Sequence, residues 1–435
     1  MKSYINKCFL ALSVLALVTG ATSCKKDFVN PNGAPEDQVF TSSRGMTAAA
    51  IGLQRTYSFS RAGSLFNIVA ANGFVTNELI LLNAGNIPEL QLSTGGATVD
   101  GTNTILANIW ANASKIMFDA DRVIAAAPTL ADKGYASGLI GYASIYKAMS
   151  LGSLAMFWDK VPDTVGSNVT FSDRVQGYTS AIATIDRAQA VIATTPISAS
   201  FAGNIPAGTD IVNTLHALKA RYALFAGNYA TALSAANSVD LTRRSTMNFD
   251  AVSINPIFET ATSTNNVFQP VDSTFGLPLA LRPTNTDKRV AFYTTISAAV
   301  APRFRVGGFG ATSGSPWPYY LPGEITLIKA ECLVRQAAPN LAAAVIELNK
   351  VITKTPAADP FGIGADQPPY AGAITAPAIL EEIYRQRSIE LFMSGLKLED
   401  MRRFGRPTTE RKRNFFPYPF RERDNNSNTP PDPAF

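Results

Sequence analysis

The chain has 435 residues, of which 46% are hydrophobic and 16% charged, and its formal net charge is +5 at pH 7. A chain of this length can bury a large core, so its fold needs no covalent cross-links. Three cysteines and a single histidine exclude a disulfide framework and a zinc site of clustered Cys and His ligands. We therefore expect no metal and no cofactor, and any acid–base chemistry would fall to carboxylates. The histidine, His216, lies in a helical pattern and is predicted to be packed.

The N-terminus has the pattern of an export signal. Lys2 and Lys7 form a short basic region, the segment CFLALSVLALV is apolar but too short to span a bilayer, and small residues precede Cys24. We predict that residues 1–23 are a signal peptide and that Cys24 becomes the acylated first residue of a lipoprotein. Ala21 stands where leucine is more usual in such a site, so an ordinary signal peptidase site is the alternative.

After the signal, composition divides the chain into a Pro/Asn-rich tether, 24–40, and a single body, 41–435. Loss of the signal removes two lysines and no acid, so the formal charge falls from +5 to +3, which identifies no partner. The basic cluster RRFGRPTTERKR resembles a nucleic-acid patch, but export makes that partner improbable and a solvated, partly paired face is preferred. No later segment has about 18 uninterrupted apolar residues, so only the lipid is expected to reach the membrane.

Helical patterns dominate the first part of the body, 41–240. The segment SSRGMTAAAIGLQRTYSF has a serine placed to cap a helix, and further helices are predicted over TNTILANIWANASKIMFDADRVIAAAP and YASGLIGYASIYKAMSLGSLAMFW. Trp110 and Trp158 fall on these helices and are predicted to be core residues. Between the first two helices, 61–103 is rich in Gly, Asn and Thr, and we predict a loop insertion there that forms either a binding surface or local sheet and loop structure.

Two segments have the pattern of a helix pair with small residues between the helices. In 213–239 a helix is followed by a turn at Gly227-Asn228 and by a second, alanine-rich helix. A weaker copy occupies 321–352, with the turn at APN. Small faces allow close antiparallel packing, and this is the pattern of a tetratricopeptide-like unit. Between the pairs, 241–320 lacks helical periodicity and is predicted to be a loop-rich ligand region.

The stretch RQRSIELFMSGLKLEDMRRFG, 385–405, concentrates charge within the C-terminal region, 321–435. We predict a helix from about 376 that ends at Gly395 and a short helix that runs to Phe404. The charged groups are interpreted as a structural clasp that fixes the angle between these helices, because exposed pairs would contribute only about 0 to 1 kcal/mol each. The predicted clasp residues are Arg387, Glu390, Gly395, Asp400, Arg402 and Arg403.

This stretch resembles the C-terminal signature of the SusD/RagB family. The residues in register are Arg387, Glu390, Leu391, Gly395, Lys397, Asp400, Met401, Arg402, Arg403, Phe404 and Gly405, and Ser394 stands where the family has Glu. Other blocks resemble the family in the same order from Cys24 to Phe435: the acylation site, IWANASKIMFDADRVI, YASIYKAMSLGSLAMFWDKVP, ALKARYALFAGNYATALSAA, YLPGEITLIKAECLVR and FPYPFRERDNNSNTPPDPAF.

The resemblance implies a mostly α fold with little β structure, in which a scaffold of tetratricopeptide-like helix pairs carries long irregular loop insertions. It also implies a non-catalytic lipoprotein on the outer membrane, facing the cell surface, that binds glycan or peptide nutrient for a SusC-like TonB-dependent transporter. We expect the loops to contact the ligand and the helix pairs to contact the transporter. Aromatic and amide chemistry in the unpatterned segments selects six candidate ligand residues: Phe74, Asn77, Glu78, Tyr293, Trp317 and Tyr319.

Two functions of other classes are kept as alternatives. A secreted glycoside hydrolase needs only a pair of carboxylates and no histidine, but most acids here lie in helical segments beside bases. A tetratricopeptide-type adaptor lipoprotein would assemble a protein complex and would need no ligand loops. Release of reducing sugar from glycans would identify the first, and poor cleavage by protease on intact cells would indicate the second.

Overall fold

The computed structural model describes residues 36–263, 267–299 and 301–435. The predicted signal peptide, Cys24 and most of the tether lie outside these residues. Before residue 40 the described chain consists of α2 (Glu36–Val39), and the rest of the structure, 40–435, forms a unit of its own.

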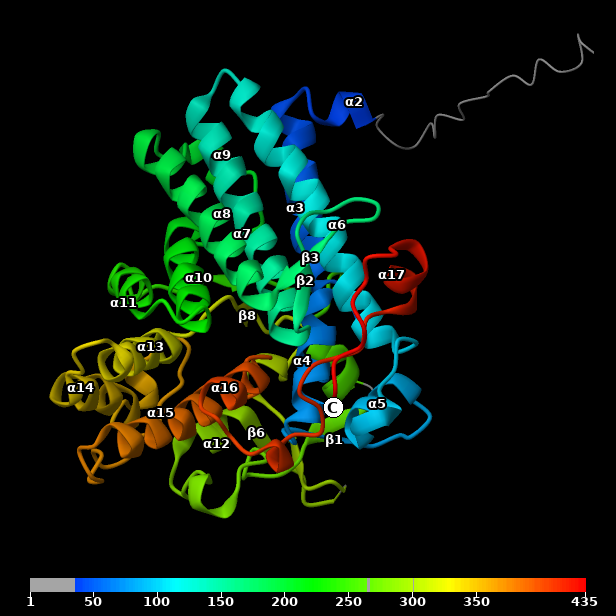
Figure 1. Cartoon of the computed structure of the whole chain (residues 1–435). Helices are drawn as coiled ribbons and strands as arrows, with labels where there is room; N and C mark the ends of the chain where they lie inside the picture. The colour runs from blue at the N-terminus through cyan, green and yellow to red at the C-terminus, as the bar shows by residue number, and fades with distance from the viewer. Residues whose placement is uncertain (1–35, 264–266, 300) are drawn as a thin grey trace, which may run out of the picture. The chain divides into compact units, whose positions relative to one another are not determined.

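Helices make up most of this body, as the sequence patterns predicted (Figure 1). The helices are α3 (Ser43–Ser58), α4 (Ser64–Val75), α5 (Ile87–Thr94), α6 (Thr104–Ala126), α7 (Lys133–Phe157), α8 (Arg174–Thr194), α9 (Ala199–Ala202), α10 (Ile211–Phe225), α11 (Tyr229–Asn237), α12 (Lys288–Tyr293), α13 (Pro322–Arg335), α14 (Leu341–Ile352), α15 (Ala376–Glu390), α16 (Lys397–Arg403) and α17 (Phe420–Asn425).

Strands are short and join in antiparallel pairs. The pairs are β1 (Leu79–Leu81) with β5 (Phe268–Pro270), β2 (Lys160–Pro162) with β3 (Phe171–Asp173), β4 (Thr246–Met247) with β8 (Trp317–Pro318), and β6 (Thr294–Ile296) with β7 (Phe304–Val306). Apart from β2 and β3, each pair includes a strand from the segment 241–320 predicted to be loop-rich. The β1–β5 ladder joins that segment to the residues after α4, whereas the β4–β8 and β6–β7 ladders lie within the segment. The segment therefore contributes no extended sheet.

The long helices α3, α6, α7 and α8 pack side by side and form the first part of the scaffold (Figure 1). The predicted cap at the start of α3 is confirmed, because the Ser42 side chain accepts a hydrogen bond from the Gly45 backbone N–H at 3.1 Å. α7 is buried along almost its whole length, and close packing is the reason for its small residues. A Cβ atom added at Gly152 would lie 2.2 Å from the Tyr222 ring of α10, which is shorter than any normal contact.

The two predicted helix pairs are present as α10 with α11 and α13 with α14. Gly227 supplies the left-handed backbone conformation of the first turn, with φ of 76°, and the Asn228 side chain caps α11 at the backbone N–H of Thr231. α13, α14 and α15 share a second, smaller core that includes Leu327, Leu348 and Ile383. Trp110 and Trp158 are buried, as predicted.

The prediction of a loop insertion over 61–103 is wrong for its first part. Residues Ser64–Val75 form α4, and all 12 of its residues are buried. Its sequence, SLFNIVAANGFV, is apolar or small on every side and therefore shows none of the periodicity that identifies a helix with one solvent face. Burial on all sides is a property of the tertiary structure, so the pattern alone could not distinguish this helix from irregular chain.

The C-terminal corner has the predicted helix, turn and helix, with a shift in one boundary. α15 begins at Ala376 as expected but ends at Glu390, five residues before Gly395. Gly395 instead lies in the turn that leads into α16, where its backbone has a φ of 84°. Glycine adopts this left-handed conformation without steric cost. The second helix ends at Arg403, next to the predicted end at Phe404.

Candidate functional site

The six candidate ligand residues are separated by the fold. Phe74 lies on α4 without exposed surface, and its ring packs against Phe268 of β5 with the ring centroids 6.1 Å apart. In this conformation Phe74 belongs to the core. Asn77 and Glu78 lie in the turn between α4 and β1, and Tyr293, Trp317 and Tyr319 meet elsewhere around a cavity.

Glu78 is fully buried and holds the turn after α4. Its Oε2 accepts a hydrogen bond from Asn72 Nδ2 at 2.8 Å, whereas Oε1 has no hydrogen-bond partner in the described part of the chain. Burial raises the pKa of Glu78 to about 7, despite the opposing charge of Lys397. Its neighbour Asn77 is half-buried and donates to the Glu410 carbonyl oxygen at 3.1 Å. Both side chains therefore have structural partners.

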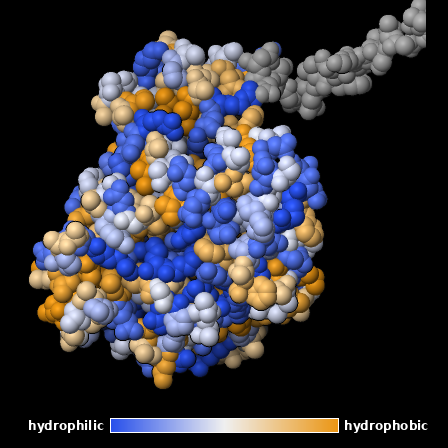
Figure 2. Space-filling view, viewed as in Figure 1, coloured by the Kyte–Doolittle hydropathy of each residue, from blue (hydrophilic) through white to orange (hydrophobic). Residues whose placement is uncertain are grey.

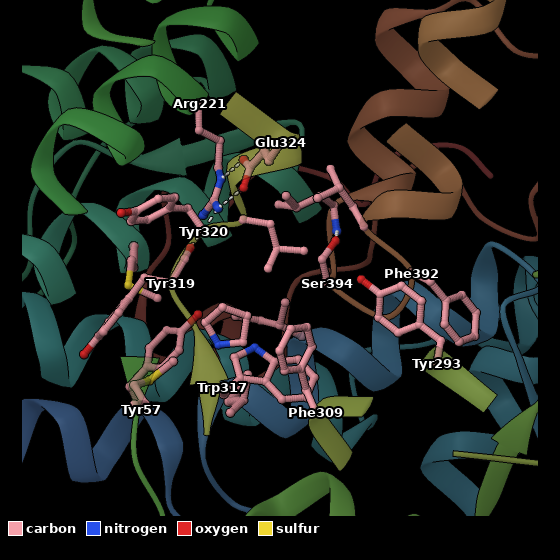
Figure 3. Close-up of a pocket in the computed structure, with 18 residues that line it drawn as sticks. Tyr57, Arg221, Tyr293, Phe309, Trp317, Tyr319, Tyr320, Glu324, Phe392 and Ser394 are labelled. Carbon is pink, nitrogen blue, oxygen red and sulfur yellow. Dashed lines mark hydrogen bonds and ion pairs between the residues drawn. The ribbon is translucent and has the colours of Figure 1, made fainter. Parts of the chain in front are cut away.

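Tyr293, Trp317 and Tyr319 line one aromatic cavity, together with Tyr57, Phe309, Tyr320 and Phe392 (Figure 3). Trp317 comes from β8, Tyr319 and Tyr320 from the segment that follows it, and Tyr57 from α3. These rings meet because β8 pairs with β4 and carries the chain directly into α13. The sequence motif WPYY, residues 317–320, supplies one wall of the cavity.

A buried ion pair closes another side of this aromatic cavity. Arg221 of α10 donates from Nε and Nη2 to the two carboxylate oxygens of Glu324 on α13, at 2.6 and 2.7 Å. Arg221 Nη2 also donates to the Tyr319 carbonyl oxygen at 2.8 Å. Burial raises the pKa of the Tyr319 hydroxyl to about 12, so the hydroxyl is neutral at physiological pH. The cavity therefore presents aromatic faces and neutral hydroxyls next to a charge pair in which Arg221 Nε and Nη2 and both Glu324 oxygens are already hydrogen-bonded.

The volume of the cavity decides what it can hold. It measures about 60 Å³, whereas pockets for small ligands usually measure ~300 to 1,000 Å³. There is room for only a few water molecules at ~10 to 15 Å³ each on this measure. In this conformation the aromatic cavity cannot take a sugar ring, and ligand contact by Tyr293, Trp317 and Tyr319 stays a prediction that requires the cavity to widen.

Residues that were not selected from the sequence complete this cavity. Arg221 and Glu324 lie in helices that were interpreted as scaffold, and Ser394, where the family has Glu, also contributes to the lining (Figure 3). The helix-pair pattern around Arg221 was visible in the sequence. Its pairing with Glu324 was not, because the two residues are 103 positions apart.

The predicted clasp is a buried network and not the exposed set of pairs that was expected. Arg387 of α15 and Arg403 of α16 both contact Asp400, at 2.8 and 2.6 Å, and Arg403 also reaches Glu331 of α13. Although burial alone would raise it, the two guanidinium groups hold the pKa of Asp400 below its ordinary value. The charges are desolvated, so their loss has a larger effect than that of surface pairs.

The remaining charged clasp residues form separate ion pairs with other elements. Arg402 pairs with Glu399 at 2.6 Å, and Glu390 accepts from Arg289 of the α12 segment at 3.1 Å and from Lys354 at 2.9 Å. Arg387 and Glu390, one helical turn apart, bind different partners. Because these contacts join α12, α13, α15 and α16, the cluster fixes the position of the loop-rich segment as well as one interhelical angle.

Other features of the described body restrict the chemistry. His216 is half-buried and its Nδ1 lies 3.0 Å from Gln189 Nε2, with burial lowering the pKa of the imidazole, as expected of a packed histidine. Within residues 36–263, 267–299 and 301–435, no group of three or more His, Cys, Asp and Glu could hold a metal ion. In the same residues, no helix combines the length and apolar character needed to cross a membrane.

Helix pairs, short isolated ladders and a charged C-terminal corner are together the features of the SusD-like fold. No family model and no curated protein matches the sequence, but solved structures match the fold. A SusD superfamily protein of Parabacteroides distasonis is 14% identical, with a TM-score of 0.69 over 93% of this chain and 100% of its own. A SusD-like carbohydrate-binding protein of Bacteroides fragilis is 14% identical, with a TM-score of 0.65 over 85% and 87%.

A third match, a laminarin-binding SusD-like protein, is 13% identical, with a TM-score of 0.60 over 90% of this chain and 99% of its own. The resemblance inferred from the residues is therefore confirmed at the level of the fold. The expectation of a mostly helical chain with paired helices and little β structure is confirmed as well.

Proposed function

We propose that this chain is a surface-exposed lipoprotein that binds glycan, or peptide, and delivers it without chemical change to a SusC-like TonB-dependent transporter. One observation carries the proposal: the SusD-like fold extends over about nine-tenths of the chain, including matches described as carbohydrate-binding and laminarin-binding proteins. The order of sequence blocks from Cys24 to Phe435 supports the same function.

The proposal assigns ligand contact and transporter contact to the two kinds of structure in the body. The irregular segments held by short ladders are proposed to form the ligand face, and the helix pairs are proposed to contact the transporter. On the face drawn in Figure 2, hydrophilic residues predominate over the middle, and hydrophobic residues gather at the left edge, where α14 lies in Figure 1. Ile346 of α14 is 61% exposed, which is compatible with a protein contact on this pair.

Binding and turnover can be separated in one experiment. The mature lipoprotein, extracted in detergent, is titrated by calorimetry with a panel of neutral oligosaccharides and short peptides, and the same mixtures are assayed for new reducing ends. Saturable binding without sugar release is the expected result. Sugar release would establish the hydrolase alternative, and co-purification with periplasmic proteins in place of a large outer-membrane barrel would establish the adaptor alternative.

The anchor requires a separate measurement. Labelled palmitate should be incorporated into the wild-type chain and not into Cys24→Ser, and protease should cleave the wild-type protein on intact cells. Unlabelled wild-type protein would show that the ordinary signal peptidase site is the correct interpretation.

Trp317→Phe tests whether the aromatic cavity contacts ligand. The substitution keeps an aromatic ring but removes the indole N–H, for which no hydrogen bond is seen to any described residue. A loss of affinity of about tenfold, the equivalent of one good hydrogen bond, would support contact with ligand. Unchanged affinity would leave Tyr293, Trp317 and Tyr319 as packing residues.

A further inference from the structure

A second cavity, here called the loop groove, lies where the two segments predicted to contact ligand, 61–103 and 241–320, meet. The β1–β5 ladder joins these segments, and beyond it the backbone of Gly276 lies so close to Asn77 that a Cβ atom at Gly276 would overlap the Asn77 carbonyl group. Both residues line the groove, which measures about 390 Å³ and falls within the usual range of small-ligand pockets, about 300 to 1,000 Å³. Four lining residues present polar atoms without a partner in the described chain: Asn77, Asp272, Arg282 and Thr409.

Asn77, one of the six residues selected from the sequence, has an open acceptor. Its Nδ2 donates to the Glu410 carbonyl oxygen at 3.1 Å, which determines which end of the amide is the donor. Oδ1 has no partner among the described residues and, unlike Oε1 of the neighbouring Glu78, it keeps solvent-accessible surface. A water-sized group can therefore touch this oxygen in the conformation described.

Asp272 supplies a second acceptor, which carries charge. Its Oδ1 accepts from the backbone N–H of Thr274 at 2.7 Å and from the Thr274 hydroxyl, so the turn uses this oxygen. Oδ2 makes no hydrogen bond or ion pair to a described residue, and it is solvent-accessible on a half-buried side chain. The turn therefore accounts for one oxygen of Asp272 and leaves the other open to a ligand.

Arg282 and Thr409 supply donors to the same groove. The Arg282 side chain is exposed, and its Nε donates to the Leu277 carbonyl oxygen at 3.2 Å, whereas Nη1 and Nη2 have no partner in the described chain. The Thr409 hydroxyl is on an exposed residue and likewise bonds to no described residue. Lys397 also lines the groove, but it is 4% exposed and donates to the Phe275 carbonyl oxygen at 2.8 Å. The accessible donors are therefore those of Arg282 and Thr409.

The charges of the lining restrict the class of ligand. The groove has two acids, Asp272 and Glu410, and two bases, Arg282 and Lys397, so no excess charge favours an anion or a cation. The half-buried Pro278 adds an aliphatic surface on which the C–H face of a sugar ring can pack. A neutral ligand that both donates and accepts hydrogen bonds fits this lining best.

We propose that the loop groove binds a neutral sugar unit, whose hydroxyl groups donate to Asp272 Oδ2 and Asn77 Oδ1 and accept from Arg282 and Thr409. This inference rests on the proposed binding function and assigns it a site and a ligand class. A hydroxyl both donates and accepts, so neighbouring hydroxyls of one ring can use acceptors and donors that line one groove. The hydrogen bonds to Asp272 and Arg282 are charge-assisted and should contribute most of the affinity.

The test uses the lipoprotein in detergent and four probes of stated composition: laminaritriose, maltotriose, mannotriose and xylotriose. Calorimetry should show that the wild type binds at least one of them. Asp272→Asn keeps an oxygen for the turn at Thr274 but replaces the open acceptor with an N–H₂ group, and should weaken that binding at least about tenfold. Asp240→Asn is the matched control, because Asp240 makes the same turn with Thr242 outside the groove, and it should bind like the wild type.

A second pair of variants tests the groove without changing a turn. Thr408 and Thr409 are adjacent and exposed, and neither hydroxyl bonds to a described residue, but of the two only Thr409 lines the groove. Thr409→Val should weaken binding by about twofold to tenfold, the effect of losing one neutral hydrogen bond, and Thr408→Val should not change it. Because neither substitution removes an internal hydrogen bond, this pair decides alone if Asp272→Asn does not fold.

The outcomes separate the site from the function. A loss of affinity in either groove variant that its control does not show supports the site. If the wild type binds a trisaccharide and neither groove variant differs from its control, the groove assignment is wrong and the binding function stands. If the wild type binds none of the four but binds trialanine, the sugar assignment is overturned and nutrient binding stands. If it binds neither, both are overturned.

Chemical protection and calcium provide independent measurements. Phenylglyoxal modifies exposed guanidinium groups, and Arg282 and Arg421 are both exposed without an ion-pair partner in the described chain. Bound trisaccharide should slow the modification of Arg282 and leave that of Arg421 unchanged, and an unprotected Arg282 would overturn the assignment. Calcium chloride should leave the melting temperature of the wild type unchanged, whereas a stabilisation by calcium that Asp272→Asn abolishes would show a cation site instead.

Discussion

Replacement of Glu78 by Gln should make the stability of the protein less sensitive to pH. Glu78 is fully buried, and burial raises its pKa from 4.5 to about 7. Below pH 4.5 the carboxyl is protonated in the folded and the unfolded chain, so its contribution to stability is fully present. Between pH 4.5 and 7 the unfolded chain releases this proton while the folded chain retains it, and stability is lost as pH rises.

The size of the effect follows from the shift. A difference of about 2.5 pKa units corresponds to about 3 kcal/mol at ~1.36 kcal/mol per unit. Glutamine has nearly the same shape and does not titrate. Relative to the wild type, Glu78→Gln should therefore gain about 3 kcal/mol of unfolding free energy between pH 4.5 and pH 8.

Urea unfolding at a series of pH values measures this difference directly. Glu347→Gln, at a half-buried acid paired with Lys350 on the surface, should show no comparable trend. A difference between Glu78→Gln and the wild type that is constant from pH 4.5 to pH 8 would refute the assignment of a protonated, desolvated carboxyl. Because Glu78 has structural partners and no exposed surface, the substitution should also leave glycan affinity unchanged.

Two other predictions concern the scaffold. Asp400→Asn should destabilise the protein by about 3 to 5 kcal/mol in urea unfolding, because it removes the anion that faces the buried Arg387 and one of the two anions that face Arg403. Lys115→Ala, on an exposed helical pair, should cost under about 1 kcal/mol, and equal effects of the two substitutions would contradict a buried clasp. Gly152→Ala should cost about 1 to 3 kcal/mol of unfolding free energy, because its Cβ would lie 2.2 Å from the Tyr222 ring. Gly52→Ala on α3 meets nothing within 4 Å and should raise stability by about 0.5 to 1 kcal/mol. A destabilised Gly52→Ala, or a neutral Gly152→Ala, would contradict the packing.

The charged C-terminal stretch, 385–405, shows which structural features a local sequence pattern can predict and which it cannot. The start of α15 and the existence of α16 were predicted from the spacing of charged and apolar residues, and Gly395 marked the break between the two helices. The partners of the charges were not predicted. Arg403 pairs with Glu331 of α13, and Glu390 pairs with Arg289 of α12; only the packing of these helices removes the water that would otherwise make such pairs weak.

The sequence by itself determined the elements whose evidence is local: the amphipathic and small-residue helices, their caps, the turn at Gly227, and the ordered motifs that indicated a SusD-like fold. Tertiary structure alone decided which side chains are exposed and which cavities exist. Phe74 and Glu78 have the same side-chain chemistry in a core as in a binding loop, so residue type alone could not place them. α4 has no polar face, so its sequence lacks the periodicity that would identify a helix. The packing of α4, α5 and α6 likewise removed one oxygen each of Asn67 and Glu89 from water without supplying a donor, which no local pattern indicates.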